Sequence, residues 1–414
     1  MTAPSRGDLE RRGLLVVPGF IDLHAHLREP GFEESETIET GSRAALRGGF
    51  TTICAMPNTE PAIDSPGLVT ELIAKSDRVA GARVLPIACI TRGRHGSELA
   101  DLIELARAGA VAFSDDGSPV SDGRLFRSAL EYARSADRVI IEHPQDLALS
   151  GRGVMHEGAV SAALGLPGVP AAAEDVAVAR DLAIAQLTGA RLHLTHLSTR
   201  GAVELVRQAK AGGLAVTADV TPHHLALTDD WVAGSRLFAW EDLAQRVEPH
   251  DGGSRQAPAS PYDPNTKVNP PLRTRADVEA CWAGLRDGTL DAIATDHAPH
   301  ASIRKDVEYQ DAAFGISGLE TALPILLAGV DRGLASLDVV LRALSGGPRR
   351  ILGLPADDDW IAIDRNAEWT IEAASLVSKG KNTPLLGRRV RGRVVFAVVD
   401  GKVRFDADQV PALA

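Results

Sequence analysis

Hydrophobic and polar positions alternate in blocks along most of the chain. Short runs of β-branched and apolar residues recur, and between them lie stretches whose apolar residues have helical spacing. The runs predict eight strands, at residues 20–24, 50–55, 83–90, 110–114, 138–143, 191–196, 214–220 and 290–295. The intervening stretches are rich in Ala, Leu, Glu and Arg, which favours amphipathic helices. They include residues 97–108, 123–135, 172–187 and 200–211. Repeated strand–helix alternation predicts a parallel sheet.

Eight strand–helix units fit either a closed barrel or a doubly wound open sheet. Barrel enzymes carry their chemistry at the carboxyl ends of many strands, whereas an open sheet concentrates its site at one crevice. In this chain His and Asp residues follow strands from the first to the last. We therefore predict an α/β fold, a (β/α)8 TIM-type barrel over residues 18–350.

Two regions do not fit the repeat. Residues 231–264 are rich in Gly, Ser, Pro and charge, which predicts a long surface insertion in the barrel. Apolar alternation over residues 389–399 and 402–405, interrupted by Asp400 and Gly401, predicts a terminal β-hairpin. Residues 1–17 and 351–414 are accordingly expected to form a small β appendage outside the barrel.

Composition and charge narrow the classes of function. Of the 414 residues 44% are hydrophobic and 24% charged, the balance of a globular protein with a substantial core. A net charge of −11 argues against nucleic-acid or anionic-membrane partners, which require a basic face. No apolar run has the length of a signal peptide or a membrane span. Cys54, Cys89 and Cys281 lack metal or redox spacing and are expected to be buried thiols in a cytoplasmic protein.

The first chemical signal is the pair His24 and His26 at the end of the first predicted strand. Alternate strand residues share a face, so the two imidazoles can bind one zinc ion together. A second signal is residues 294–300, where Asp296 stands among histidines. Asp296 could bind a metal through one oxygen and shuttle a proton through the other. Each motif taken alone is also compatible with a structural role.

Further ligand types recur at the ends of the intermediate strands. Asp116 follows the fourth predicted strand, and His143 and His196 close the fifth and sixth. Imidazole and carboxylate without thiolate suit zinc or a similar divalent ion, and Asp116 could bridge two ions. Asp115 is the alternative to Asp116 within the same pair. The pattern predicts a metal centre at the barrel mouth.

The remaining histidines are given other roles. His193 lies three residues before His196 and is expected to be structural, within the strand wall. His223 and His224 follow the seventh strand, where they could support the metal ligands. Polar surroundings predict solvent exposure for His95, His156 and His250.

Several motifs together resemble one enzyme family. Residues 18–31 (PGFIDLHAHLREPG) are similar to the opening signature of bacterial dihydroorotases of the type found with aspartate transcarbamoylase. The resemblance continues in residues 48–52, 56–59, 267–273, 294–300 and 314–320. It spans nearly the whole predicted barrel and implies that the chain is similar to the amidohydrolases in fold and chemistry.

The resemblance implies a role for each matching residue. It implies one or two Zn²⁺ ions per subunit, with ligands at His24, His26, Asp116, His143, His196 and Asp296. It implies substrate contacts from Arg28, Asn58, Asn269 and His300 and from the backbone at Phe314 and Gly315. The implied reaction is reversible hydrolysis of the cyclic amide of (S)-dihydroorotate to N-carbamoyl-L-aspartate, a step of de novo pyrimidine (UMP) biosynthesis. Metal-bound hydroxide would attack, and Asp296 would be the catalytic proton shuttle. The planar fork of Arg28 suits the carboxylate of either compound.

The chain departs from the family pattern at its ends. Relatives usually have a few dozen more residues before the first barrel strand, as part of a small β-sandwich, whereas here only residues 1–17 precede it. The region around residues 355–364 also looks shortened, so the appendage is expected to be reduced to the terminal hairpin.

Two alternative functions stay open. A hydantoinase or allantoinase would use the same barrel on other cyclic ureides, but such relatives bridge their metals with a carbamylated lysine where this chain has Asp116. A catalytically silent scaffold for aspartate transcarbamoylase should have lost ligands, and all six positions are filled. A partnership with that transferase and a homo-oligomeric state are further expectations from the resemblance.

Overall fold

The computed structural model describes residues 4–241 and 260–408, and it confirms the predicted barrel. Eight parallel strands form one sheet in the order β11-β10-β9-β6-β5-β4-β3-β2. They are β2 (Phe20–Ala25), β3 (Phe50–Ala55), β4 (Arg83–Ala88), β5 (Ala112–Phe113), β6 (Val139–Glu142), β9 (Leu192–Leu194), β10 (Val216–Val220) and β11 (Ala292–Ile293). The first and last strands meet just beyond β11, where the His26 N–H donates to the His297 carbonyl over 2.8 Å. The sheet thereby closes into a barrel.

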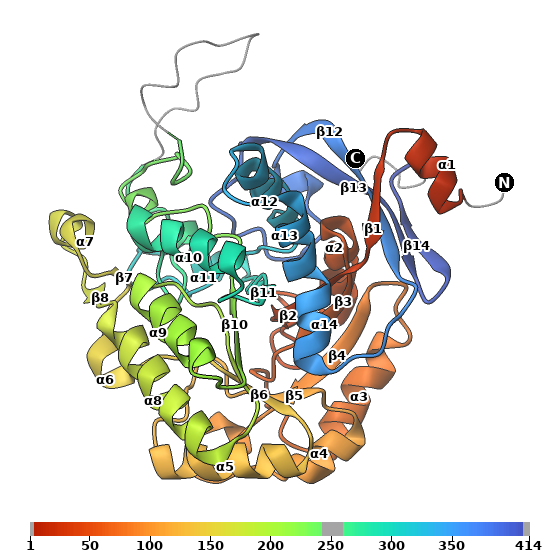
Figure 1. Cartoon of the computed structure of the whole chain (residues 1–414). Helices are drawn as coiled ribbons and strands as arrows, with labels where there is room; N and C mark the ends of the chain where they lie inside the picture. The colour runs from red at the N-terminus through yellow and green to blue at the C-terminus, as the bar shows by residue number, and fades with distance from the viewer. Residues whose placement is uncertain (1–3, 242–259, 409–414) are drawn as a thin grey trace.

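Helices surround this barrel as an outer layer (Figure 1). They are α2 (Ile38–Gly48), α3 (Pro66–Ser76), α4 (Leu102–Ala108), α5 (Gly123–Ser135), α8 (Ala172–Thr188), α9 (Arg200–Ala211), α10 (Arg275–Asp287), α12 (Ala322–Asp331), α13 (Leu337–Leu344) and α14 (Gly346–Leu352). Shorter elements lie in the connections: α6 (Leu147–Ser150), α7 (Ala159–Leu164), α11 (Ser302–Lys305), a two-stranded sheet of β7 (Met155–His156) and β8 (Gly168–Val169), and the 3-10 turns η1 (Arg92–Arg94), η2 (Asp229–Trp231), η4 (Pro264–Thr266) and η5 (Ala373–Ser375).

The apolar core has two layers because each barrel strand is buried on both faces. One layer packs the strands against the surrounding helices. The other fills the barrel interior with residues such as Leu23, Ile87 and Ile141, together with Ile351 and Leu352 of α14. With apolar side chains inside, the barrel is a packed support for its polar rim and not a pore. The cysteines of the sequence are free and buried, as expected.

The predicted barrel elements agree closely with the observed ones. Each of the eight predicted strands overlaps an observed strand, and α5 and α9 begin and end at the predicted residues. Within residues 97–108 only α4 is helical. The preceding residues 97 and 98 are bends, Leu99 is bridged to Thr91, and Asp101 caps the helix by accepting from the Glu104 N–H.

A four-stranded sheet lies beside the barrel (Figure 1). Its order is β1 (Leu15–Pro18), β12 (Trp360–Thr370), β13 (Arg389–Val399) and β14 (Lys402–Asp406), and the short helix α1 (Arg6–Arg11) precedes it. The predicted hairpin is present as β13 and β14, but the expectation that the appendage is reduced to this hairpin was wrong. Strand β12 escaped prediction because its first four residues are all buried and the rest are mostly exposed, which leaves no alternating signal.

The predicted surface insertion is described only at its two ends. Trp231 and Phe238 are buried in one apolar cluster with Val268, so the first part of the segment is packed and not superficial. The Trp231 indole N–H donates to the Leu237 carbonyl over 2.6 Å. The middle of the predicted insertion, with His250, lies outside the described residues.

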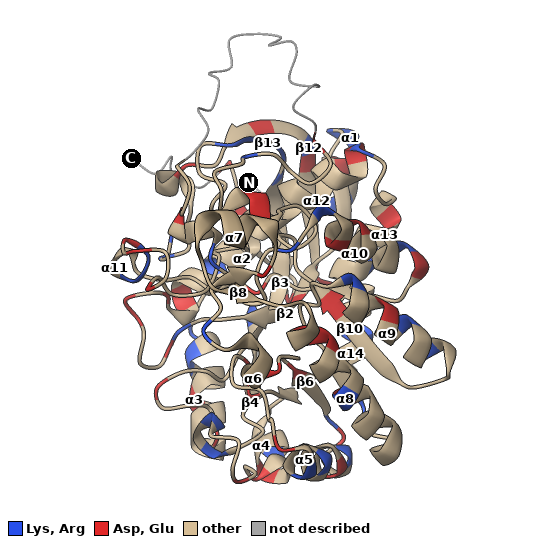
Figure 2. Cartoon of the chain, turned by 90° about the vertical axis from the view of Figure 1, so that its left-hand side faces the viewer, with Lys and Arg blue, Asp and Glu red and all other residues tan. Residues whose placement is uncertain are grey.

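Charges of both signs are mixed on the outer helices, for example on α4 and α5 (Figure 2). Across residues 4–241 and 260–408, none of the helices combines the length and the apolar character needed to cross a membrane.

One prediction concerns the stability of the helical layer. Asp122 caps α5, because its carboxylate accepts from the Arg124 and Leu125 N–H groups at 2.8 and 3.1 Å. We expect Asp122→Ala to lower the free energy of unfolding by about 1 kcal/mol in urea titrations. Ser128→Ala, at an exposed position of the same helix, should change it by less than about 0.5 kcal/mol. Equal losses in both variants would contradict this role of Asp122.

Candidate metal centre and active site

The six predicted metal ligands converge at the carboxyl ends of the barrel strands. They come from the ends of β2, β5, β6, β9 and β11, and their residues are only 1–5% exposed: His24, His26, Asp116, His143, His196 and Asp296. Strands that are distant in sequence thus deliver two carboxylates and four imidazoles to one buried volume.

One half of the cluster joins the first and last strands. His24 Nε2 lies 3.2 Å from His26 Nε2. Asp296 Oδ1 lies 3.1 Å from His26 Nε2 and 3.4 Å from His24 Nε2. These three groups place their ligand atoms within 4.8 Å of one another, close enough to hold one metal ion.

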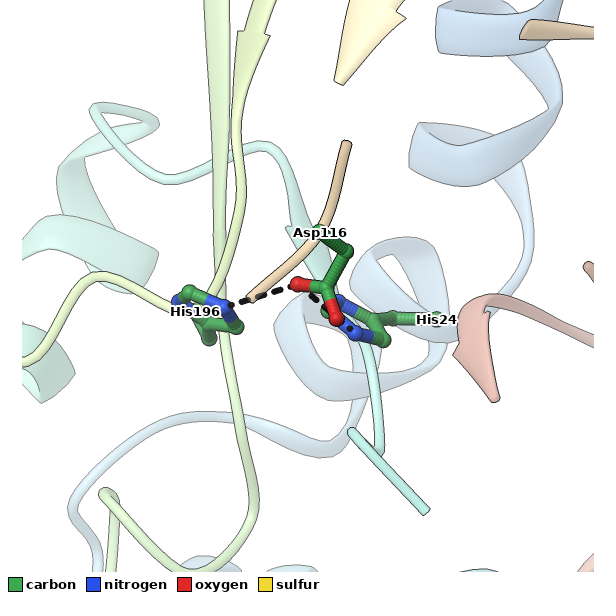
Figure 3. A group of neighbouring side chains, drawn as sticks. All are labelled: His24, Asp116 and His196. Atoms are coloured by element: carbon green, nitrogen blue, oxygen red, sulfur yellow. Dashed lines mark ion pairs between the residues drawn. The ribbon is translucent and has the colours of Figure 1, made fainter. Parts of the chain in front are cut away.

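The other half is built around Asp116. Asp116 Oδ1 lies 3.4 Å from both His24 Nε2 and His143 Nδ1, and 3.6 Å from His196 Nε2. Its other oxygen, Oδ2, lies 3.6 Å from His26 Nε2. Figure 3 shows the carboxylate between the imidazoles of His24 and His196, with all three side chains directed toward one another. Asp116 therefore stands where it can bridge the two halves.

Of the neighbouring pair Asp115 and Asp116, only Asp116 faces the imidazoles. Asp115 Oδ1 accepts the N–H groups of Ile90 and Thr91 at 2.8 and 3.1 Å, and its other oxygen accepts the Thr91 hydroxyl. Both carboxylate oxygens of Asp115 thus accept hydrogen bonds that fix the loop after β4. The geometry favours Asp116 over Asp115 as the ligand.

Burial and neighbouring charges set the protonation of the cluster. Burial raises the pKa of Asp116, but the nearby imidazoles of His24, His143 and His196 lower it by more than burial raises it. The pKa of Asp116 is therefore well below the ordinary value. The pKa of Asp296 is likewise lowered, because His24 and His26 outweigh burial. Burial lowers the pKa of His24, yet Asp116 and Asp296 raise it to about 9. Both carboxylates are therefore ionised, as metal ligands must be.

The side chains of the predicted metal ligands are oriented by neighbouring residues. For these neighbours the sequence predicted either no role or a different role. His24 Nδ1 is 3.0 Å from the Thr195 hydroxyl, and His26 Nδ1 is 2.8 Å from Asn58 Oδ1. His143 Nε2 is 2.8 Å from Gln145 Oε1, which turns its Nδ1 toward Asp116. Such partners fix the ring orientation and tautomer of a metal-binding histidine.

Asp22 ties the two ends of the barrel beneath the cluster. Its carboxylate accepts the backbone N–H of Thr295 at 2.8 Å and the Thr295 hydroxyl at 2.5 Å, and also the N–H of His24 at 3.2 Å. The motif that carries His24 and His26 is thereby held against the segment that carries Asp296. The position of Asp22 two residues before His24 is the signal that sequence reasoning passed over.

Three site residues have a left-handed backbone. Arg28, His196 and Asp296 have φ values of 61°, 42° and 46°. Non-glycine residues rarely adopt this conformation, and such strain clusters at functional sites, where the surrounding structure maintains it.

The side chains fit a metal centre. Asp116 Oδ1 is buried without a hydrogen-bond partner, as are His196 Nδ1 and His223 Nε2. Buried polar atoms without partners are costly, and a cation among the ligand atoms would compensate the carboxylate. Two carboxylates and four imidazoles with no nearby thiolate form a donor set that suits zinc.

A pocket of about 220 Å³ opens next to the cluster. The predicted substrate residues line it together with several predicted ligands: His26, Arg28, Asn58, Asp116, Gly117, His143, Asn269, Asp296, Ala298, His300, Phe314 and Gly315. All six positions expected to contact substrate are thus brought to one cavity.

Arg28 supplies the positive charge of this pocket. Its Nε donates to the Pro299 carbonyl over 3.1 Å, and its Nη2 lies 3.3 Å from His300 Nε2. None of the described carboxylates lies within ion-pair distance of the guanidinium. Burial lowers the pKa of Arg28 to about 10, so it stays charged at neutral pH. Burial and the charge of Arg28 lower the pKa of His300 to about 3, which keeps that imidazole neutral.

The two asparagines of the pocket already have protein partners. Asn58 bonds His26 through Oδ1, and its Nδ2 lies 3.5 Å from Asp116 Oδ2. Asn269 Nδ2 donates to Gln145 Oε1 over 2.8 Å. Each amide therefore connects the pocket wall to the ligand cluster as well as facing the cavity.

Of two histidines outside the cluster, His193 has the structural role that was expected, whereas the prediction for His156 was wrong. His193 is buried in the wall and bonds Asp219 and Thr217 at 2.8 and 2.9 Å, a structural role as expected. His156 was expected at the surface, but it is 8% exposed and lies 3.2 Å from Arg273 Nη1. The segment that carries His156 forms the buried strand β7, which the polar sequence around His156 did not reveal.

His223 and His224 are both buried near the mouth. His224 is held by Thr221 and the Pro270 carbonyl at 2.8 and 3.0 Å. His223 keeps Nε2 unpartnered, and burial lowers its pKa to about 4. It is therefore a neutral imidazole beside the cluster.

A parallel barrel with a buried cluster of histidine and aspartate side chains at its carboxyl rim, able to hold a metal ion, defines the class of protein as a barrel with a candidate metal centre. Solved structures share the fold: the L-hydantoinase (dihydropyrimidinase) from Arthrobacter aurescens matches with a TM-score of 0.79 at 24% identity, over 97% of this chain and 88% of that one. At this identity the likeness establishes the fold alone.

The sequence comparisons identify the family. A family model described as dihydro-orotase-like matches residues 13–202. The dihydroorotase of Anaeromyxobacter dehalogenans (strain 2CP-C) is 50% identical over 403 residues, 95% of this chain and 87% of that relative. The dihydroorotase of Geobacter sp. (strain M21) is 47% identical, over 96% of this chain and 89% of that relative. The chain belongs to the dihydroorotase family.

Proposed function

We propose that this protein is a zinc-dependent dihydroorotase, which interconverts (S)-dihydroorotate and N-carbamoyl-L-aspartate in pyrimidine biosynthesis. The observation that carries the proposal is the juxtaposition, in one cavity, of the Arg28 guanidinium and the buried cluster of Asp116, Asp296 and four imidazoles. The guanidinium has no carboxylate partner among the described residues. The first group suits the carboxylate of the substrate and the second suits amide hydrolysis. Family membership supports the same reaction.

The geometry supports two metal positions that share Asp116. His24, His26 and Asp296 would hold one ion, and His143 and His196 the other, with Asp116 between them. Bound zinc would supply the Lewis acid and the activated water that amide hydrolysis at neutral pH requires.

The chain's own groups would orient the substrate and move the proton. Arg28 would grip the carboxylate, with Asn269, His300 and the backbone of Phe314 and Gly315 around it, while Asn58 fixes His26 at the edge of the pocket. Asp296 faces His24 and His26 through Oδ1, which leaves its other oxygen to take a proton from the attacking water. Delivery of this proton to the departing ring nitrogen would complete ring opening, and cyclisation would use the same groups in reverse.

The alternative functions fit less well. A hydantoinase-like site is expected to have a lysine at the end of β5, where this chain has Asp116, and a neutral ureide would leave Arg28 unpaired. A silent scaffold would not need six buried ligand groups within one cluster, because uncompensated buried charge costs stability. Partnership with aspartate transcarbamoylase, a homo-oligomeric state and a cytoplasmic location stay predictions.

The metal requirement gives a direct test. We expect elemental analysis of the zinc-loaded protein to find about two zinc ions per chain, since two ions sharing one carboxylate are a common arrangement for hydrolysis. Removal of zinc by a chelator should lower the turnover of dihydroorotate by about 100-fold or more, and added zinc should restore it. His143→Ala should retain at most one tightly bound ion. Full activity of the metal-free protein would contradict the proposal.

A further inference from the structure

One wall of the pocket is held from outside the barrel by a short segment that the sequence analysis gave no role. Residues 378–382, which we call the strap, follow η5 and belong to neither a helix nor a strand. The strap runs against two loops: residues 298–300 after β11, and residues 314–317. These loops carry the predicted substrate contacts His300, Phe314 and Gly315.

Asn382 connects the two loops with its side chain. Its Nδ2 donates to the carbonyls of Ala298 and Gly315, each over 3.0 Å, and its Oδ1 accepts the His300 N–H at 2.8 Å. The side chain is buried, and its backbone carbonyl accepts a further bond from the Ser317 N–H at 3.0 Å. Both donors and the acceptor of this amide are therefore used to fix the spacing between the loops.

Gly380 lets the strap approach His300 closely. A Cβ added at this position would lie 2.5 Å from the His300 nitrogen and 2.7 Å from Pro299 Cβ, so any larger residue would push the loop away. His300 in turn lies 2.8 Å, through Nε2, from the Phe314 carbonyl. A displacement of the strap would therefore be transmitted to both predicted substrate contacts.

Two carboxylates anchor the other end of the strap to the barrel. Glu36, which is fully buried before α2, accepts the Ser378 hydroxyl at 2.5 Å and the Lys379 N–H at 3.2 Å. Glu320, whose side chain is 7% exposed, accepts the Ser378 N–H at 3.0 Å. Buried charge-assisted hydrogen bonds of this kind hold a loop rigidly, and Glu36 also lies 3.3 Å from His297, the neighbour of Asp296.

We propose that Asn382 is a positioning residue for substrate binding, which holds His300 and the Phe314–Gly315 backbone at the spacing that the substrate carboxylate and ring require. The inference rests on the proposed function. The bonds made by Asn382 go to the two pocket loops and to none of the six metal ligands. Its loss should therefore weaken substrate binding more than it slows the chemical step.

The test compares two variants with a matched control. Asn382→Asp keeps the shape of the side chain and the acceptor for His300, but sets an oxygen against the carbonyls of Ala298 and Gly315. We expect it to raise KM for dihydroorotate about tenfold or more and to change kcat less than about threefold, with bound zinc unchanged. Asn366→Asp makes the same chemical change at an exposed position of β12 and should leave both constants as in the wild type.

Gly380→Ala displaces the same loop without altering Asn382, and it carries the test if Asn382→Asp does not fold. It should show the same rise in KM. Wild-type KM in both strap variants, when the wild type turns over dihydroorotate, would overturn the inference and leave the proposed function intact. A loss of zinc together with a matching fall in kcat would show a general structural role and would also overturn it. A wild type without dihydroorotate turnover would overturn the proposed function, and the inference with it.

Discussion

Asp296→Asn should lower kcat for dihydroorotate about 1000-fold or more, because an amide cannot take up and release the proton that we propose the carboxylate transfers. The side chain keeps its shape and lies at the carboxyl end of β11, 3.1 Å from His26 Nε2, so the barrel should stay folded. Turnover in both directions of the reaction and the melting temperature would be measured together.

Asp338→Asn provides the control for this variant, since it makes the same change at an exposed position of α13. It should retain wild-type kcat. If Asp296→Asn kept more than about a tenth of the wild-type turnover, Asp296 could not be the proton shuttle, because loss of a general acid–base usually costs 100-fold or more.

Arg28→Met should raise KM for dihydroorotate about 100-fold. The guanidinium is the charged group of the pocket that suits a carboxylate, and loss of two charge-assisted hydrogen bonds costs about 3 kcal/mol. Arg28→Lys should recover little of this loss, because an ammonium cannot reproduce the bidentate fork. Steady-state kinetics with dihydroorotate and with neutral hydantoin would separate loss of charge recognition from general damage.

Arg43→Met is the matched control, because Arg43 is exposed on α2 and pairs with Glu39 across one helical turn. It should leave KM unchanged. An unaltered KM in Arg28→Met would mean that the substrate carboxylate is bound elsewhere, and the basis for preferring dihydroorotate over a neutral ureide would be lost.

The barrel and the cluster could be predicted from sequence because both follow from local patterns and one topological rule. Apolar runs mark the strands, and the carboxyl ends of parallel strands meet at one rim. Residues as distant in sequence as His24 and Asp296 are therefore expected to lie close together, although the local sequence around each residue does not predict this contact. The fold alone makes the six predicted ligand positions neighbours.

The roles of individual residues could not be predicted from the sequence where they depend on the paths of loops. Asp115 and Asp116 are indistinguishable by pattern, and only the approach of Ile90 and Thr91 to Asp115 separates their roles. Gln145 and Asn382 make their hydrogen bonds across loops whose course no periodicity encodes.

The appended sheet shows the same limit for a strand. Strand β12 is buried on both faces at its start and exposed toward its end, so it lacks the alternation by which strands are recognised. The hairpin of β13 and β14 was found because its turn residues, Asp400 and Gly401, mark the break between two runs.

The proposed dihydroorotase activity is best tested by the substrate preference of the purified, zinc-loaded protein. Values of kcat/KM would be measured for dihydroorotate, hydantoin and allantoin under the same conditions, together with cyclisation of N-carbamoyl-L-aspartate. We predict turnover in both directions and a preference for dihydroorotate over the neutral ureides of about 100-fold or more, because a site built to bind a charged group discriminates strongly against compounds that lack it. Faster turnover of hydantoin or allantoin than of dihydroorotate would contradict the proposed activity.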